Sequence, residues 1–228
     1  MKSKRGIYGI IAAFFFVAFI VYTILVTRID VQPIGPLGSN VGFATMNAKF
    51  AALVPANEVW YEMTQLMGYL SMFICALFGL VGAIQLFKEK SIMKVNKDIL
   101  CLGALYSICI AMYVLFEFVE INVRPVLEDG MLSASYPSSH TVLGICVFAS
   151  LAVEIKRNIT DARAPIFKMG CYGMICLMVG GRMLSGWHWI SDIIGACIIS
   201  CAFIFGFLAI LPERKCARDL AAEVFDRK

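Results

Sequence analysis

Three residues that could do chemistry lie close together in the stretch GRMLSGWHWISDIIG. They are Arg182, His188 and Asp192. His188 and Asp192 are four residues apart, so they share one helix face if the helix has begun at His188. A carboxylate in that place can fix the tautomer and orientation of an imidazole, as an activated histidine requires. The alternative is structural, with His188 in an interfacial aromatic belt between Trp187 and Trp189 and Asp192 as a helix cap.

A second polar segment, FEFVEINVRPVLEDGMLSASYPSSH, contains Arg124 and ends at Ser138, Ser139 and His140. Small hydroxyl residues at a helix start leave backbone N–H groups that can bind an anion. A plain serine N-cap is the alternative interpretation. His140 and His188 are the two histidines of the chain. If both segments meet, the chain offers two arginines, two imidazoles and a carboxylate, a set suited to a phosphate monoester or diphosphate.

The same histidine and aspartate side chains could in principle bind zinc. Cationic arginines beside them favour an anion over a metal ion. We therefore expect no metal and no other cofactor.

The composition says which kind of chain must position these residues. The sequence has 228 residues, of which 60% are hydrophobic and 16% charged, and this excludes an ordinary soluble domain. Six apolar runs approach the roughly 20 residues that a membrane-spanning helix needs. They are Ile7 to Thr27, Val59 to Phe87, Ile99 to Ile121, His140 to Ile155, Ile166 to Leu184 and Ile190 to Leu211. We expect an all-α integral membrane protein, a bundle of six transmembrane helices in a single domain over residues 1–228.

The first apolar run could also be read as a signal peptide, because a basic segment precedes it. It is long for such a peptide, and it ends near Arg28 without a small-residue cleavage pattern. We therefore expect it to remain as a transmembrane helix.

The positive charges predict the orientation in the membrane. Of the 20 Lys and Arg residues, only Arg28, Lys49, Arg124 and Arg182 fall on one side of a six-helix arrangement, and 16 fall on the other. The positive-inside rule then places both termini and the short charged tail 213–228 in the cytoplasm, and the polar segments outside. The net charge of +4 reflects this topology and contact with anionic lipid of the bilayer, so we expect no nucleic-acid partner.

The first outward segment, residues 28–58, is rich in Gly and Pro and then shows Phe43, Met46, Phe50 and Leu53 at near-helical spacing. This pattern predicts a short amphipathic helix on the membrane surface. A lid that packs over the bundle and a part in substrate access are both compatible with it.

The two polar segments together resemble the type 2 phosphatidic acid phosphatase (PAP2) superfamily, which also includes vanadium haloperoxidases. The family patterns are Lys-x6-Arg-Pro, Pro-Ser-Gly-His and Ser-Arg-x5-His-x3-Asp. Here the matching residues are Arg124 and Pro125, then Pro137, Ser138, Ser139 and His140, then Arg182, His188 and Asp192. The resemblance covers residues 117–192, and the whole chain is similar to a bacterial membrane member.

Three positions depart from these patterns. Ser139 stands at the family's glycine and Gly181 at its serine, and both replacements are small. Glu117 stands at the first lysine, so an anion replaces a phosphate-binding cation. If the helix continues, Glu117, Glu120 and Arg124 form one stripe, with Glu120 paired to Arg124 at i, i+4. These two glutamates are then possible modulators of activity and substrate choice.

The resemblance implies a mechanism. His188 would attack phosphorus to form a phosphohistidine, with Asp192 on its other ring nitrogen. Arg124, Arg182, Ser138 and Ser139 would hold the phosphoryl oxygens in the transition state. His140 would protonate the leaving oxygen and then activate water.

The expected substrate is a phosphorylated lipid, whose phosphate reaches the outer surface of the plasma membrane while its tail stays in the bilayer. Undecaprenyl diphosphate is the first candidate from the resemblance, ahead of phosphatidate and phosphatidylglycerophosphate. Two other classes stay open, namely a lipid phosphotransferase with the same histidine and a non-catalytic lipid-binding or transport protein. The sequence says nothing about the oligomeric state.

Overall fold

The described part of the chain, residues 4–159 and 161–213 of a computed structural model, is helical and contains no strand. Seven α-helices and two short 3₁₀ helices follow one another. The helices are α1 (Lys4–Arg28), α2 (Ala44–Leu53), α3 (Glu58–Glu89), α4 (Lys97–Phe118), α5 (Ser139–Asn158), α6 (Ala164–Ser185) and α7 (Ile190–Ile210). The 3₁₀ helices are η1 (Pro36–Gly38) and η2 (Ile92–Lys94). Residues 214–228 of the predicted tail lie outside the described residues.

Six of these helices, all except α2, are long and apolar enough to cross a membrane. The prediction of a six-helix transmembrane bundle is therefore confirmed. The boundary difference that matters for the polar segments is at α4, which ends at Phe118 instead of continuing to residue 121. After it the chain becomes extended, with a bridge between Val123 and Ala134. Pro125 favours this change, because a residue that precedes proline is disfavoured in the helical region.

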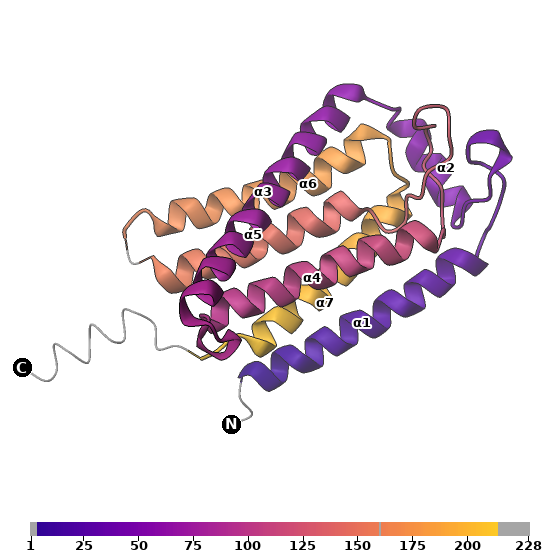
Figure 1. The fold of residues 1–228 in the computed structure, drawn as a ribbon. Coiled ribbons are helices and arrows are strands. Elements are labelled where there is room, and N and C mark those ends of the chain that lie inside the picture. The colour runs from indigo at the N-terminus through magenta and orange to yellow at the C-terminus, as the bar shows by residue number, and fades with distance from the viewer. Residues whose placement is uncertain (1–3, 160, 214–228) are drawn as a thin grey trace, which may run out of the picture.

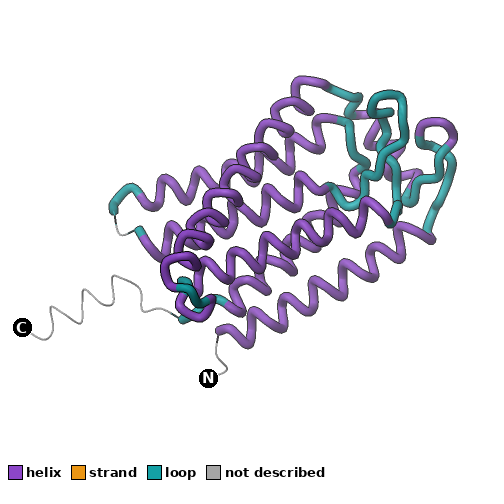
Figure 2. Tube along the Cα trace, viewed as in Figure 1, coloured by secondary structure: helices purple, strands orange, loops and turns teal. Residues whose placement is uncertain are grey.

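The connections between the helices are unequal at the two ends of the bundle (Figures 1 and 2). The long segments 29–57 and 119–138 and the short link 186–189 gather at one end, called here the site end. The start of α1 and the end of α7 lie together at the other end, the terminal end. There Arg5 Nε donates to the carbonyl oxygen of Ala209 over 2.9 Å. The orientation of these ends in a cell stays a prediction from the charge distribution.

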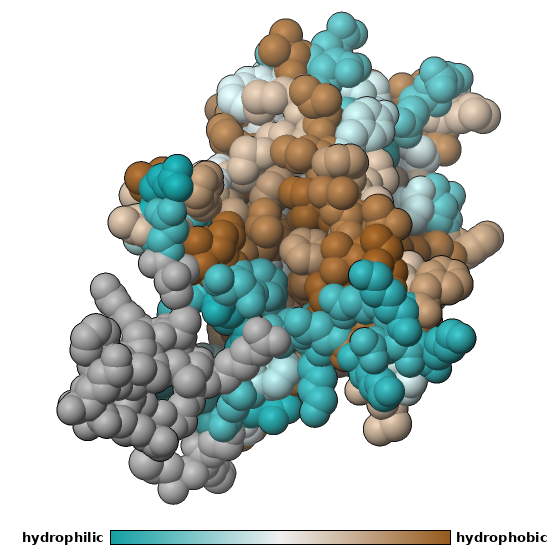
Figure 3. All heavy atoms as spheres, turned by 60° about the vertical axis from the view of Figure 1, so that its left-hand side comes forward, coloured by the Kyte–Doolittle hydropathy of each residue, from teal (hydrophilic) through white to brown (hydrophobic). Residues whose placement is uncertain are grey.

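The surface between the two ends is apolar. Figure 3 shows hydrophobic residues gathered over the middle of the visible face and hydrophilic residues near its lower edge. Large side chains such as Phe14, Phe73 and Leu115 are more than half exposed. A bilayer removes such surface from water, as a spanning helix requires.

Helices α5 and α7 are the most buried spans, with 50% and 44% of their most apolar windows inside the protein. Their site ends pack around Tyr136, a loop residue that is 1% exposed. Its ring stacks on Phe19 of α1 at 6.1 Å between centroids, and its hydroxyl lies 2.7 Å from Thr23 Oγ1. Gly195 of α7 makes this packing possible, because a Cβ there would lie 2.6 Å from Tyr136 Cε2.

The short helix α2 confirms that the Phe43 to Leu53 pattern is helical. Only Ala44 and Asn47 of this helix are buried, whereas Leu53 is 81% exposed. The position of α2 on a membrane surface stays a prediction.

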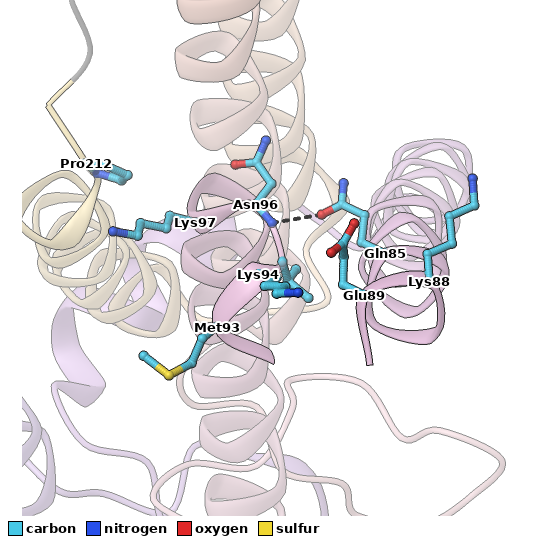
Figure 4. Close-up of a pocket in the computed structure, with 9 residues that line it drawn as sticks. Gln85, Lys88, Glu89, Met93, Lys94, Asn96, Lys97 and Pro212 are labelled. Atoms are coloured by element: carbon cyan, nitrogen blue, oxygen red, sulfur yellow. Dashed lines mark hydrogen bonds between the residues drawn. The ribbon is translucent and has the colours of Figure 1, made fainter. Parts of the chain in front are cut away.

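A hollow of about 590 Å³ lies at the terminal end, between the last turn of α3, η2 and the start of α4 (Figure 4). Its lining includes Lys88, Glu89, Lys94 and Lys97. None of the candidate residues of the polar segments lines it, so the hollow and the candidate chemistry are at opposite ends of the bundle.

The contact between Gly195 and Tyr136 provides a test of the packing. Gly195→Ala is expected to destabilise the protein by about 1–3 kcal/mol, because the new methyl overlaps an aromatic ring that is held on both sides. Thermal unfolding in detergent measures the effect.

The control is Gly206→Ala in the same helix, where a Cβ meets nothing within 4 Å. Ala has the higher helix propensity, so this variant should unfold at the wild-type temperature or above it. Equal unfolding temperatures for the two variants would contradict the packing described.

Candidate active site

His188 lies just before α7, not on it. Helix α7 begins at Ile190 with Trp189 as its N-cap, and Asp192 is in its first turn. The Asp192 carboxylate points toward the residues that precede α7. Its Oδ2 accepts the Trp189 N–H over 3.0 Å and lies 3.7 Å from His188 Nδ1. The shared helix face expected from the spacing is therefore absent, but capping brings the two side chains together.

The His188 ring is buried, with an exposed fraction of 4%. Its Nδ1 lies 3.1 Å from the carbonyl oxygen of Ser135. Since a carbonyl can only accept, Nδ1 carries the proton and Nε2 keeps its lone pair. Nε2 has no hydrogen-bond partner among the described residues. This is the tautomer that a nucleophilic Nε2 needs.

Burial is the main factor that lowers the pKa of His188 below its ordinary value. The hydrogen bond and the negative charge of Asp192 raise this pKa, and the positive charges of Arg182 and Arg124 lower it further. Both arginines are thus close enough to act on the ring. The imidazole is neutral at neutral pH.

Asp192 is fully buried, and a network of amides holds its second oxygen. Asn122 Nδ2 donates to Asp192 Oδ1 over 3.1 Å, and Ser191 Oγ lies 3.3 Å from the same oxygen. Asn47 of α2 donates to Ser191 Oγ over 2.9 Å, and Asn122 Oδ1 accepts the Gly42 N–H over 3.0 Å. The outer segment 29–57 is therefore attached to the carboxylate beside His188.

Arg182 is fully buried near the end of α6. Its Nη2 donates to Gln65 Oε1 over 2.6 Å, and its guanidinium carbon lies 5.4 Å from the centre of the Tyr61 ring. Tyr61 in turn stacks on Trp187 at 3.8 Å. Arg182 Nε and Nη1 have no partner within the described part of the chain. A buried cation with two unused donors is a strong anion site.

Arg124 does not pair with Glu120, contrary to the prediction from an extended helix. Since α4 ends at Phe118, the i, i+4 relation of these residues does not exist. Arg124 Nη1 instead contacts Glu128 Oε2 at 3.1 Å, and Nε donates to the Ala134 carbonyl over 3.4 Å. Glu117 and Glu120 are both exposed, and the Arg124 side chain turns to Glu128 and Ala134 in their place.

Ser138, Ser139 and His140 form the start of α5. Ser138 is the N-cap residue of α5, as the alternative interpretation has it, but its side chain makes no cap hydrogen bond and instead accepts from Thr141 Oγ1 over 2.9 Å. Its backbone N–H donates to the Asp192 carbonyl over 3.3 Å, which joins the starts of α5 and α7. His140 packs on Gly68 of α3, where a Cβ would lie 2.5 Å from its ring. Arg182, Arg124 and His188 are all close enough to act electrostatically on His140.

Trp189 contradicts the aromatic-belt alternative. It is 4% exposed, and its Nε1 donates to the Val123 carbonyl over 2.7 Å. This residue joins α7 to the segment that carries Arg124 and does not face lipid.

The structure adds five residues that the sequence interpretation missed. They are Asn47, Tyr61, Gln65, Asn122 and Glu128. Gln65 offered a signal, because a polar amide inside an apolar span is unusual and typically faces the bundle interior. Asn122 and Glu128 lie in the segment after α4, where polar residues are common, and Asn47 in α2 and Tyr61 in the first turn of α3 gave no comparable signal.

Among residues 4–159 and 161–213, no three His, Cys, Asp or Glu side chains are close enough together to hold a metal ion. The arrangement suits an anion instead: two guanidinium groups and two imidazoles lie close together at the site end, next to a buried carboxylate.

Comparisons with known proteins agree with this arrangement. A solved structure described as the first transmembrane PAP2 type phosphatidylglycerolphosphate phosphatase from Bacillus subtilis has a similar fold, with a TM-score of 0.58 and 20% sequence identity. The match covers 87% of this chain and 94% of that one. No curated protein sequence matches significantly. The family model of the PAP2 superfamily matches residues 10–216. The chain is therefore a member of the PAP2 superfamily.

Proposed function

We propose that this protein is a lipid phosphate phosphohydrolase that acts through a phosphohistidine on His188. The observation that carries the proposal is a set of buried polar atoms without partners in the described structure. They are His188 Nε2, His140 Nδ1, Arg182 Nε and Arg182 Nη1. Buried polar groups are nearly always hydrogen-bonded, so this group indicates a ligand. A phosphate could accept from the guanidinium, and membership of the PAP2 superfamily supports this ligand.

In the first step His188 Nε2 attacks phosphorus and the bond to the leaving oxygen breaks. The attacking nitrogen becomes positive, and the Ser135 carbonyl and the Asp192 carboxylate near Nδ1 stabilise that charge. A proton that enters with the bound phosphate charges His140, which then donates this proton to the leaving oxygen. Arg182, Arg124 and the polar groups of Ser138 and Ser139 stabilise charge on the phosphoryl oxygens.

In the second step a water molecule occupies the place that the leaving group has vacated beside His140. His140, now neutral, takes a proton from the water, whose oxygen attacks phosphorus. The P–N bond breaks, inorganic phosphate leaves and His188 returns to its neutral form. No step uses a metal ion.

The substrate is a phosphorylated lipid, because the site is at one end of an apolar bundle. Undecaprenyl diphosphate is our first candidate, and phosphatidate and phosphatidylglycerophosphate follow. The function described for the Bacillus subtilis structure supports the last of these. The distribution of Lys and Arg supports a site end on the extracytoplasmic side of the plasma membrane.

His188→Ala is expected to lower the rate of phosphate release from these lipids by at least about 10³-fold, because no other nucleophile replaces the imidazole. Wild-type release should be unchanged in EDTA. The measurement is inorganic phosphate released in detergent, with undecaprenyl diphosphate and phosphatidate as substrates.

Glu117→Lys, which restores the family's lysine, is the comparison variant. Glu117 is exposed, so its rate should stay within about threefold of wild type. Release that survives in His188→Ala would refute the phosphohistidine. A folded wild type that dephosphorylates the substrate lipid only when an acceptor lipid is added, and leaves the phosphoryl group on that acceptor, would be a transferase.

The pH dependence of the rate tests the neutral imidazole. Because the pKa of His188 is lowered below 6.5, the neutral form predominates at pH 6.5 and is lost as the pH falls further. The acid limb of kcat/KM should therefore lie below pH 6.5. It should keep this position with monophosphate and diphosphate substrates, which separates enzyme from substrate ionisation. An acid limb above pH 7 would contradict a neutral His188.

Asn122→Ala tests the network around Asp192. Losing a hydrogen bond to a buried carboxylate is expected to lower kcat by about 10- to 100-fold with little change in KM, since the network touches Asp192 and not the phosphate. Steady-state kinetics measure both constants. Asn40→Ala, an exposed amide of the same outer region, is the control and should behave as wild type. A rise in KM with unchanged kcat would instead place Asn122 in substrate binding.

A further inference from the structure

Glu128 holds one of the two arginines of the candidate site. Its Oε2 lies 3.1 Å from Arg124 Nη1, and the side chains are 38% and 15% exposed. A carboxylate and a phosphate use the same guanidinium donors. Whatever anion binds Arg124 at Nη1 must therefore compete with Glu128.

The backbone beneath this ion pair is a tight turn. Glu128 and Met131 exchange N–H to carbonyl hydrogen bonds of 3.1 and 2.9 Å. Between them Asp129 and Gly130 have φ angles of 51° and 78°, as a two-residue hairpin turn requires. The turn fixes the Glu128 backbone, while its side chain is partly exposed to solvent.

The carboxylate also belongs to a chain of polar contacts that joins both arginines. Tyr61 Oη donates to Glu128 Oε1 over a long 3.5 Å, and Gln65 Nε2 donates to Tyr61 Oη over 3.2 Å. Gln65 Oε1 then accepts from Arg182. Helix α3 thus connects Arg182 to the Arg124–Glu128 pair.

We propose that Glu128 is a specificity-determining residue that competes with phosphate for Arg124. The inference rests on the proposed function of the same site. The carboxylate lowers the affinity for highly charged phosphates in two ways: it occupies Nη1, and its negative charge repels a dianion. Inorganic phosphate, the reaction product, consequently leaves more easily.

The test is the affinity for inorganic phosphate, measured by titration calorimetry on the full chain in detergent, without any lipid substrate. Glu128→Gln should tighten binding by about tenfold, because it removes a half-exposed ion pair and one repulsive charge. The inhibition constant for inorganic phosphate in the hydrolysis assay should fall by the same factor.

Asp129→Asn is the matched control. It removes a neighbouring carboxylate from the same turn, and Asn tolerates the positive φ of that position. Phosphate binding should stay at the wild-type value. Thermal unfolding of both variants confirms that they are folded.

A double-mutant cycle assigns the effect to Arg124. In an Arg124→Gln background, Glu128→Gln should tighten binding by much less than tenfold. An undiminished gain there, or phosphate binding in Glu128→Gln that is unchanged or weaker than in wild type, would overturn the inference. If wild type hydrolyses no lipid phosphate but Glu128→Gln still binds phosphate more tightly, the proposed function fails and the competition stands.

Discussion

The structure of the site end depends on the burial of one carboxylate. Asp192 is fully enclosed, and a buried carboxylate is tolerated only when hydrogen bonds and opposite charge replace water. Its direct partners come from two parts of the chain, the start of α7 with Trp189 and Ser191 and the segment after α4 with Asn122. Asn47 of α2 adds a third part indirectly, because it donates to Ser191. Satisfying this carboxylate therefore brings the outer segments together, and His188 lies beside it as a consequence.

The two arginines of the candidate site differ in how their positive charges are stabilised. Arg182 is inside the bundle, where Gln65 and the Tyr61 ring satisfy part of its guanidinium and leave two donors free. Arg124 is nearer the surface and has a full carboxylate partner in Glu128. In the proposed function the buried arginine binds the phosphate with its unused donors, whereas the outer arginine would exchange Glu128 for the phosphate. Helix α3 contributes to both, although it carries none of the residues that match the family patterns.

The apolar bundle makes this polar end possible. Six spanning helices place every long connection at one end, and α5 and α7, the most buried spans, begin there side by side. A packed ring such as Tyr136 beneath the site holds these helix starts against α1. The membrane and the chemistry are therefore separated along the bundle axis. A lipid substrate would meet both, with its tail against the apolar surface and its phosphate at the site end.

The sequence by itself determined the number and type of the helices, because apolar runs of spanning length have few other stable structures. It also indicated the candidate site residues, since the motif residues Arg124, His140, Arg182, His188 and Asp192 are all at the site end. It mispredicted the Glu117–Glu120–Arg124 stripe, because helical periodicity assumes a helix that here ends at Phe118. Only the tertiary structure decided the partners: Glu128 for Arg124, Gln65 for Arg182, and Asn122 with Asn47 around Asp192. These contacts join residues from different helices and loops, and such pairs leave no periodic pattern in a single sequence.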